Sequence, residues 1–165
     1  MNPVFSAATV LEGLKDFQRR TVEYAFARMF GGDNRSRRFL VADEVGLGKT
    51  LVAKGLIAKT VEHLWDKADR IDVIYVCSNA DIAAQNVARL MIPGQPTYAR
   101  ATRLTLLPLV TQELRAHRVN FISFTPGTTF NQGHRSGRRD ERILIYQMLR
   151  ELELNRTGFR GGLLA

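Results

Sequence analysis

The sequence is poor in the residues that build disulfide frameworks, metal clusters and membrane spans. Its 165 residues include one cysteine, Cys77, which has no internal disulfide partner, and three scattered histidines without metal-ligand spacing. No apolar run reaches the ~18 residues that a membrane-spanning helix needs, and the N-terminus lacks the basic and apolar pattern of a secretory signal. We therefore expect a cytoplasmic protein with no membrane partner, in which Cys77 is a buried, inert thiol.

Acidic residues are scarce in the second half of the chain. Residues 1–82 hold 12 basic and 11 acidic residues, whereas residues 83–165 hold 12 basic and 5 acidic residues. Every basic residue after Lys67 is an arginine, which suits bidentate contacts to phosphate. This pattern favours a polyanionic partner such as nucleic acid, although an arginine-biased genome would produce the same count.

One stretch, residues 39–50, has the layout of a phosphate-binding loop. Phe39 to Ala42 predict a buried strand, the following glycines predict a turn, and a helix is expected to begin near Lys49. Glycines let successive backbone N–H groups point into one concavity, and the start of a helix adds its positive dipole end. The alternative interpretation is a glycine turn that carries an exposed lysine.

The residues of this loop predict a bound nucleotide, ATP, together with Mg²⁺. Lys49 is the candidate catalytic residue because its charge would contact the outer phosphates, and the Thr50 hydroxyl is the candidate Mg²⁺ ligand. The first position of the motif is Asp43 instead of glycine, so only its second half is strict. The candidate ATP-binding residues of the loop are Glu44, Val45, Gly46, Leu47, Gly48, Lys49 and Thr50.

The sequence Asp-Glu-Val-Gly-Leu-Gly-Lys-Thr, residues 43–50, resembles motif I of superfamily 2 helicases and translocases, in particular the Swi/Snf-like and related bacterial branch. Upstream, Leu14-Lys15-Asp16-Phe17-Gln18 resembles the Q motif of that superfamily, which implies that Phe17 and Gln18 contact ATP. A glutamine amide has the donor and the acceptor needed to read the adenine edge. The alternative interpretation, without any contact to ATP, is a packed Phe17 beside a solvated Gln18.

Apolar periodicity predicts an α/β fold. We expect a helix over residues 11–30, a helix after the phosphate loop, and apolar strands at 71–77 and 119–124, the first covered on both faces. A short strand within 98–107 and a helix over about 140–154 are further expectations. The strand at 39–42, the helix after the phosphate loop and the strand at 71–77 follow one another without a hairpin turn, which is the βαβ unit of an α/β fold. The resemblance implies a RecA-like P-loop NTPase, a three-layer sandwich with a parallel sheet, present here in incomplete form.

Two further turns are candidate nucleic-acid contacts. The segment after residue 77 resembles motif Ia, and the tetrapeptide after residue 124 resembles motif Ib, although Thr128 stands where DEAD-box relatives have arginine. The plain alternatives are an N-cap at Ser78 or Asn79 and a proline-glycine turn. The candidate residues are Asn79, Gln85, Thr125, Pro126, Gly127 and Thr128. An arginine-rich loop, residues 131–139, follows them.

The resemblance covers about residues 11–154 and includes neither the acidic motif that holds magnesium nor a second RecA-like domain. It implies an N-terminal helix with a Q-like motif over 1–36, a partial RecA-like domain over 37–156 and a tail over 157–165. The function expected is the ATP-binding part of a nucleic-acid-dependent helicase or translocase, with DNA favoured over RNA and with the rest of the motor as a partner. A nucleotide-gated nucleic-acid-binding module without turnover and a basic adaptor with an inactive loop are the alternatives.

Overall fold

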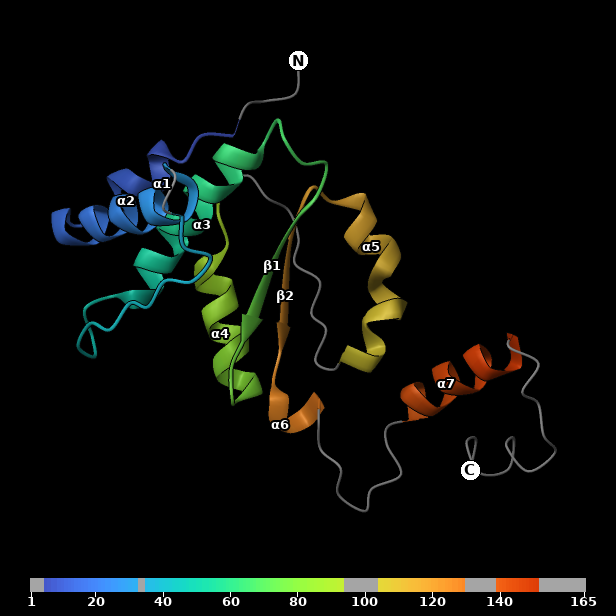
Figure 1. The fold of residues 1–165 in the computed structure, drawn as a ribbon. Helices are drawn as coiled ribbons and strands as arrows, with labels where there is room; N and C mark the ends of the chain where they lie inside the picture. Colours follow the sequence, from blue (N-terminus) through green and yellow to red (C-terminus); the bar gives the residue numbers. More distant parts are fainter. Residues whose placement is uncertain (1–4, 33–34, 94–103, 130–138, 152–165) are drawn as a thin grey trace.

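The computed structural model describes residues 5–32, 35–93, 104–129 and 139–151. They form a mixed α/β fold with a small two-stranded parallel sheet and helices packed against it (Figure 1). In chain order the elements are α1 (Ala8–Glu12), α2 (Asp16–Phe30), α3 (Lys49–Leu64), β1 (Ile71–Val76), α4 (Ala80–Leu90), the 3₁₀ helix η1 (Leu104–Val110), α5 (Thr111–Ala116), β2 (Val119–Phe124), α6 (Pro126–Thr129) and α7 (Arg139–Glu151).

The sheet confirms the strands expected at 71–77 and 119–124, but not the expected βαβ unit of residues 39–77, because its first strand is not formed. β1 and β2 are parallel, and their register runs from Ile71 opposite Val119 to Val76 opposite Phe124. Parallel strands cannot be joined by a tight turn, and here α4, η1 and α5 lie between them in the chain. Both strands therefore end at the same edge of the sheet, where the segments that follow them come together.

The main core lies on one face of the sheet, between the strands and the helices α1, α3 and α4 (Figure 1). Small and β-branched side chains from α3 and α4 meet the alternate inward residues of both strands, as expected where helices cover a pleated surface. The buried residues of this cluster include Val10, Ala58, Val61, Ile71, Val87, Leu90, Val119 and Phe121.

The other face of the sheet is covered at β2 but not at β1 in the described part of the chain. Ile122 of β2 packs with Leu114 of α5, whereas Ile74 and Val76 of β1 are 60% and 54% exposed. The expectation that the first strand is covered on both faces is therefore wrong for these residues. The apolar sequence of β1 could not show that one face is uncovered, because the same sequence is compatible with a strand covered on one face or on both.

The helix expected over residues 11–30 is divided in two. α1 ends at Glu12 and α2 begins at Asp16, with Gly13 to Lys15 between them. The side chain of Gln18 accepts a hydrogen bond from the Lys15 backbone N–H at 3.0 Å, which caps the second helix. The apolar spacing continues across the break, because Leu14 is itself buried, so periodicity alone predicted one helix.

The strand expected at Phe39 to Ala42 is absent, because these residues belong to no helix or strand of the described structure. A strand needs a neighbour to pair its backbone groups, and β1 and β2 pair only with each other among the described residues. Val41 packs beside the small cluster of Leu14, Val22 and Val52, while Leu40 is 84% exposed.

Several smaller expectations changed as well. Residues 104–107 of the expected short strand belong to η1, a 3₁₀ helix that contains Pro108, and residues 98–103 lie outside the described ranges. Cys77 is half-buried instead of buried. The helix expected to reach Leu154 is α7, whose described part ends at Glu151. Most of the arginine-rich loop and the tail over 157–165 lie outside the described residues.

Candidate functional site

The turn before α3 has the backbone geometry that its glycines were expected to provide. Gly46 and Gly48 have φ angles of +92° and +81°, in the left-handed region that glycine adopts without steric cost. α3 then begins at Lys49, as predicted, and in the described structure no side chain caps its first N–H groups. An uncapped helix start beside a left-handed turn is a suitable place for an anion.

Gln18 of α2 lies directly beneath this turn. Its Nε2 donates a hydrogen bond to the Leu47 carbonyl at 3.0 Å, and its Oε1 accepts from the Lys15 N–H. The side chain is buried, at 3% exposure, and a Cβ built on Gly48 would lie 2.5 Å from Nε2. Gly48 is thus required both for its φ angle and for the close approach of Gln18.

The alternative of a packed Phe17 beside a solvated Gln18 is wrong, because Phe17 is 43% exposed and Gln18 is buried. Each polar atom of the Gln18 amide already has a partner in the chain. The structure therefore brings Gln18 to the glycine loop before α3 as a support for its backbone. Its reading of adenine, and the contact of Phe17 with ATP, stay predictions.

The side chain of Lys49 is hydrogen-bonded to the backbone at the start of the same loop. Its Nζ donates to the carbonyl oxygens of Asp43 at 2.7 Å and Glu44 at 2.8 Å. An ammonium group has three donors, so one N–H remains for a further acceptor such as a phosphate oxygen. Of the other loop residues, Glu44 is exposed and Val45 is 98% exposed.

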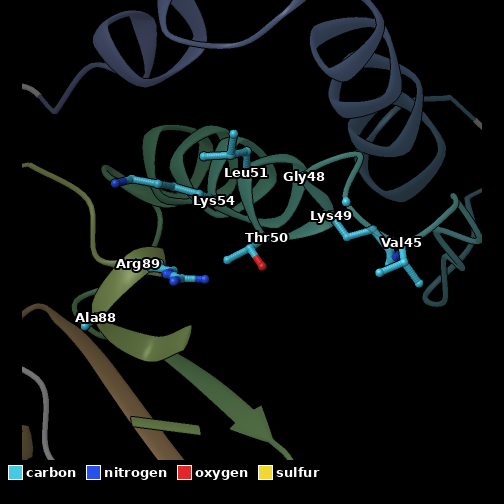
Figure 2. A pocket seen from close by; sticks show the side chains of 9 residues that line it. Val45, Gly48, Lys49, Thr50, Leu51, Lys54, Ala88 and Arg89 are labelled. Carbon is cyan, nitrogen blue, oxygen red and sulfur yellow. The ribbon is translucent and has the colours of Figure 1, made fainter. Parts of the chain in front are cut away.

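A pocket of about 730 Å³ opens between the loop, α3 and α4 (Figure 2). This volume falls within the range of roughly 300–1,000 Å³ typical of ligand pockets. Figure 2 shows the Thr50 hydroxyl and the Arg89 guanidinium in the space between the two helices, while Lys49 extends toward Val45. The lining residues are Val45, Gly46, Gly48, Lys49, Thr50, Leu51 and Lys54 from the loop and α3, and Ala88 and Arg89 from α4.

The charge of this pocket is positive. Lys49, Lys54 and Arg89 line it, and no carboxylate does so among the described residues. Sequence reasoning found Lys49 and missed Lys54 and Arg89. Lys54 follows Thr50 by four residues, a spacing that places both on one side of a helix and could have indicated it. Arg89 had no local signal, because α4 had to be placed against α3 first.

The fit of Mg²⁺ depends on Thr50 alone. Its hydroxyl faces the pocket, and no cluster of three or more histidine, cysteine or carboxylate side chains suited to a metal occurs in the part of the chain that the structure describes. Magnesium usually keeps several waters and takes phosphate oxygens as ligands, so a nucleotide-bound ion would need few ligands from the protein, and Thr50 fits that requirement.

The two candidate nucleic-acid turns meet at one edge of the sheet. Val76 and Phe124 are register partners, so Asn79 and Thr125 follow neighbouring strand ends. Asn79 is the N-cap of α4, as one interpretation predicted: its Oδ1 accepts from the N–H groups of Asp81 at 2.8 Å and Ile82 at 3.1 Å. Its side chain is exposed.

The second turn is less open than the resemblance implies. Thr125 is 3% exposed, Pro126 is half-buried, and the segment forms the short helix α6 instead of a simple turn. Gly127 is exposed, while the side chain of Thr128 lies outside the described set. Gln85 is exposed on α4. Among the predicted contacts whose burial the structure describes, Asn79, Gln85 and Gly127 are exposed.

Comparison with known proteins adds no assignment: no family model, curated protein or solved structure matches the chain. None of the helices in the described ranges combines the length and the apolar composition needed to cross a membrane.

Proposed function

We propose that the chain is the ATP-binding portion of a nucleic-acid-dependent helicase or translocase, which hydrolyses ATP to move on DNA or RNA in the complete motor. One observation carries the proposal: two left-handed glycines lead into the uncapped start of α3 beside a pocket lined by three cationic side chains. A polyphosphate chain is the ligand that this combination of backbone N–H groups and cations suits best.

The nucleic-acid part of the proposal is supported by two features. The segments that resemble motifs Ia and Ib follow adjacent, parallel strands and so share one edge of the sheet. The second half of the chain has 12 basic and 5 acidic residues. A RecA-like three-layer domain, a second RecA-like domain as partner, a preference for DNA and a cytoplasmic location complete the proposal.

A second candidate function is a nucleotide-gated nucleic-acid-binding module without turnover. It is favoured by the absence of any carboxylate from the pocket lining in the described structure. Hydrolysis in this class depends on acidic residues that orient magnesium and water and on arginines that meet the developing charge. Both candidates share the same nucleotide pocket and differ in turnover.

Calorimetric titration with ATP and Mg²⁺ tests the pocket. Lys49→Ala should weaken ATP binding at least ~10-fold, about 1.4 kcal/mol, because it removes the cation at the mouth of the loop. The matched control is Lys67→Ala, which makes the same charge change at an exposed position just beyond the far end of α3. Equal ATP affinity in the parent and in Lys49→Ala would contradict the proposed phosphate loop.

A phosphate-release assay separates the two candidates. For residues 1–165 alone we expect no ATPase activity above background, with or without single- and double-stranded DNA and RNA, even where ATP binds. Stimulated turnover that disappears in Lys49→Ala would contradict this expectation and would show that the chain contains a catalytic acid. A longer protein that includes an acidic motif and turns over ATP would support the motor over the binding module.

A further inference from the structure

Arg89 stands on the wall of the pocket opposite the phosphate loop. It belongs to the last turn of α4, whereas the other cationic residues that line the pocket come from α3. Its neighbours Val87 and Leu90 are buried in the main core with Ala58 and Val61 of α3. Because this contact fixes α4 against α3, the position of Arg89 at the pocket is set by the core and not by a loose surface helix.

The charge of Arg89 is not neutralised within the chain as described. Within the described residues, Arg89 takes part in neither the Lys59–Glu23 nor the Arg70–Asp72 ion pair. Its side chain is exposed, and Figure 2 shows its guanidinium in the same space as the Thr50 hydroxyl. An arginine that lines a pocket without a carboxylate partner is available for an anionic ligand.

The start of α3, Lys49 and Arg89 would each contact a different part of a bound phosphate chain. The start of α3 and the third donor of Lys49 serve phosphates that lie in the loop, since two donors of Lys49 are held by loop carbonyls. Arg89 approaches from the other helix and therefore faces the part of the ligand that extends out of the loop. A guanidinium presents parallel N–H groups that match two oxygens of one phosphate.

We propose that Arg89 binds the outermost phosphate of the nucleotide and so makes this pocket prefer a nucleoside triphosphate to a diphosphate. The inference rests on the proposed nucleotide-binding function and adds a residue from α4 to it. It also gives the nucleotide a contact on the helix whose N-cap is Asn79, a candidate nucleic-acid contact. A ligand bound to Arg89 would therefore contact α4, the helix whose other end carries Asn79 at the sheet edge where nucleic acid is expected.

The test is titration of the full chain with ATP and with ADP, each with Mg²⁺. Arg89→Ala should weaken ATP binding about 10-fold, the effect of losing one charge-assisted contact, and should change ADP binding less than about 2-fold. Arg89→Lys should fall between the parent and Arg89→Ala, because it keeps the charge and loses the fork. The matched control is Arg115→Ala, an exposed arginine on α5, whose residue Leu114 packs on the opposite face of the sheet.

The outcomes separate this inference from the proposed function. An unchanged ratio of ATP to ADP affinity in Arg89→Ala, with ATP binding still lost in Lys49→Ala, would overturn the role of Arg89 and leave the nucleotide pocket standing. Equal losses for ATP and ADP, or a loss confined to nucleic-acid binding, would also overturn it. Failure of the parent to bind either nucleotide would overturn both proposals. Circular dichroism of each variant shows whether it is folded, and Arg89→Lys gives the answer if Arg89→Ala is not.

Discussion

Replacing Gln18 by alanine should destabilise the protein through the phosphate loop. The substitution removes a hydrogen bond to the Lys15 N–H and one to the Leu47 carbonyl, both 3.0 Å long, from a side chain that is 3% exposed. At a net value of about 1 kcal/mol for each bond, the free energy of unfolding should fall by about 2 kcal/mol. For a chain of this length that corresponds to a decrease in melting temperature of about 4–8 °C.

Urea denaturation gives the free energy of unfolding, and a matched substitution controls it. Gln85 is an exposed glutamine on α4, so Gln85→Ala should change the stability by less than about 0.5 kcal/mol. If Gln18→Ala costs no more than Gln85→Ala, Gln18 does not anchor the loop as the structure indicates.

The same variant also distinguishes support of the loop from reading of adenine. A residue that holds the Leu47 carbonyl shapes the proposed phosphate site, so its loss should weaken ATP and GTP binding by similar factors. A residue that reads the adenine edge should affect ATP alone, because guanine presents a different pattern of donors and acceptors. If Gln18→Ala and the parent favour ATP over GTP to the same degree, the Q-motif interpretation fails while the anchoring role remains.

Four further expectations concern the loop, the sheet edge and the basic charge of the chain. Gly46→Ala should cost about 1–2 kcal/mol of stability in urea denaturation for its left-handed conformation alone, since nothing lies within 4 Å of the added Cβ. Gly48→Ala should cost about 1 kcal/mol more, because it also displaces the hydrogen-bonded Gln18 amide, and equal costs would argue against that contact. Asn79→Ala should destabilise the chain by about 1 kcal/mol in the same assay, whereas Asn79→Asp, which keeps the cap, should not. Nucleic-acid binding should fall by roughly 0.7–0.9 log units per log unit of salt for each phosphate contacted, and a salt-insensitive or absent interaction in a filter-binding titration would favour the arginine-biased genome as the source of the charge.

Local chemistry was sufficient to predict the turn, the start of the following helix, one cap and two of the four expected strands, those at 71–77 and 119–124. A left-handed turn needs glycine, and Gly46 and Gly48 supply it immediately before Lys49. Asn79 caps α4 through an oxygen that reaches N–H groups only two and three residues away. Such features depend on neighbours in the sequence, so reading the sequence is enough to find them.

Pairing and coverage were not predictable in the same way. Residues 39–42 have the composition of a strand, yet no described strand lies beside them to pair with. The apolar sequence of β1 predicted cover on both faces, but α3 and α4 lie on one face and leave Ile74 and Val76 exposed. The sequence shows how hydrophobic each residue is, but which segment packs over that residue depends on the whole fold.

The sequence by itself determined that a glycine turn would precede a helix starting at Lys49, because spacing along one short segment fixes that geometry. Only the tertiary structure decided what surrounds the loop. Gln18 lies 29 residues before Leu47 and still supports its carbonyl, and Arg89 reaches the pocket because the core holds α4 against α3. Contacts between distant segments depend on how helices pack, and helical packing follows from the combined shape of many side chains and not from any single motif.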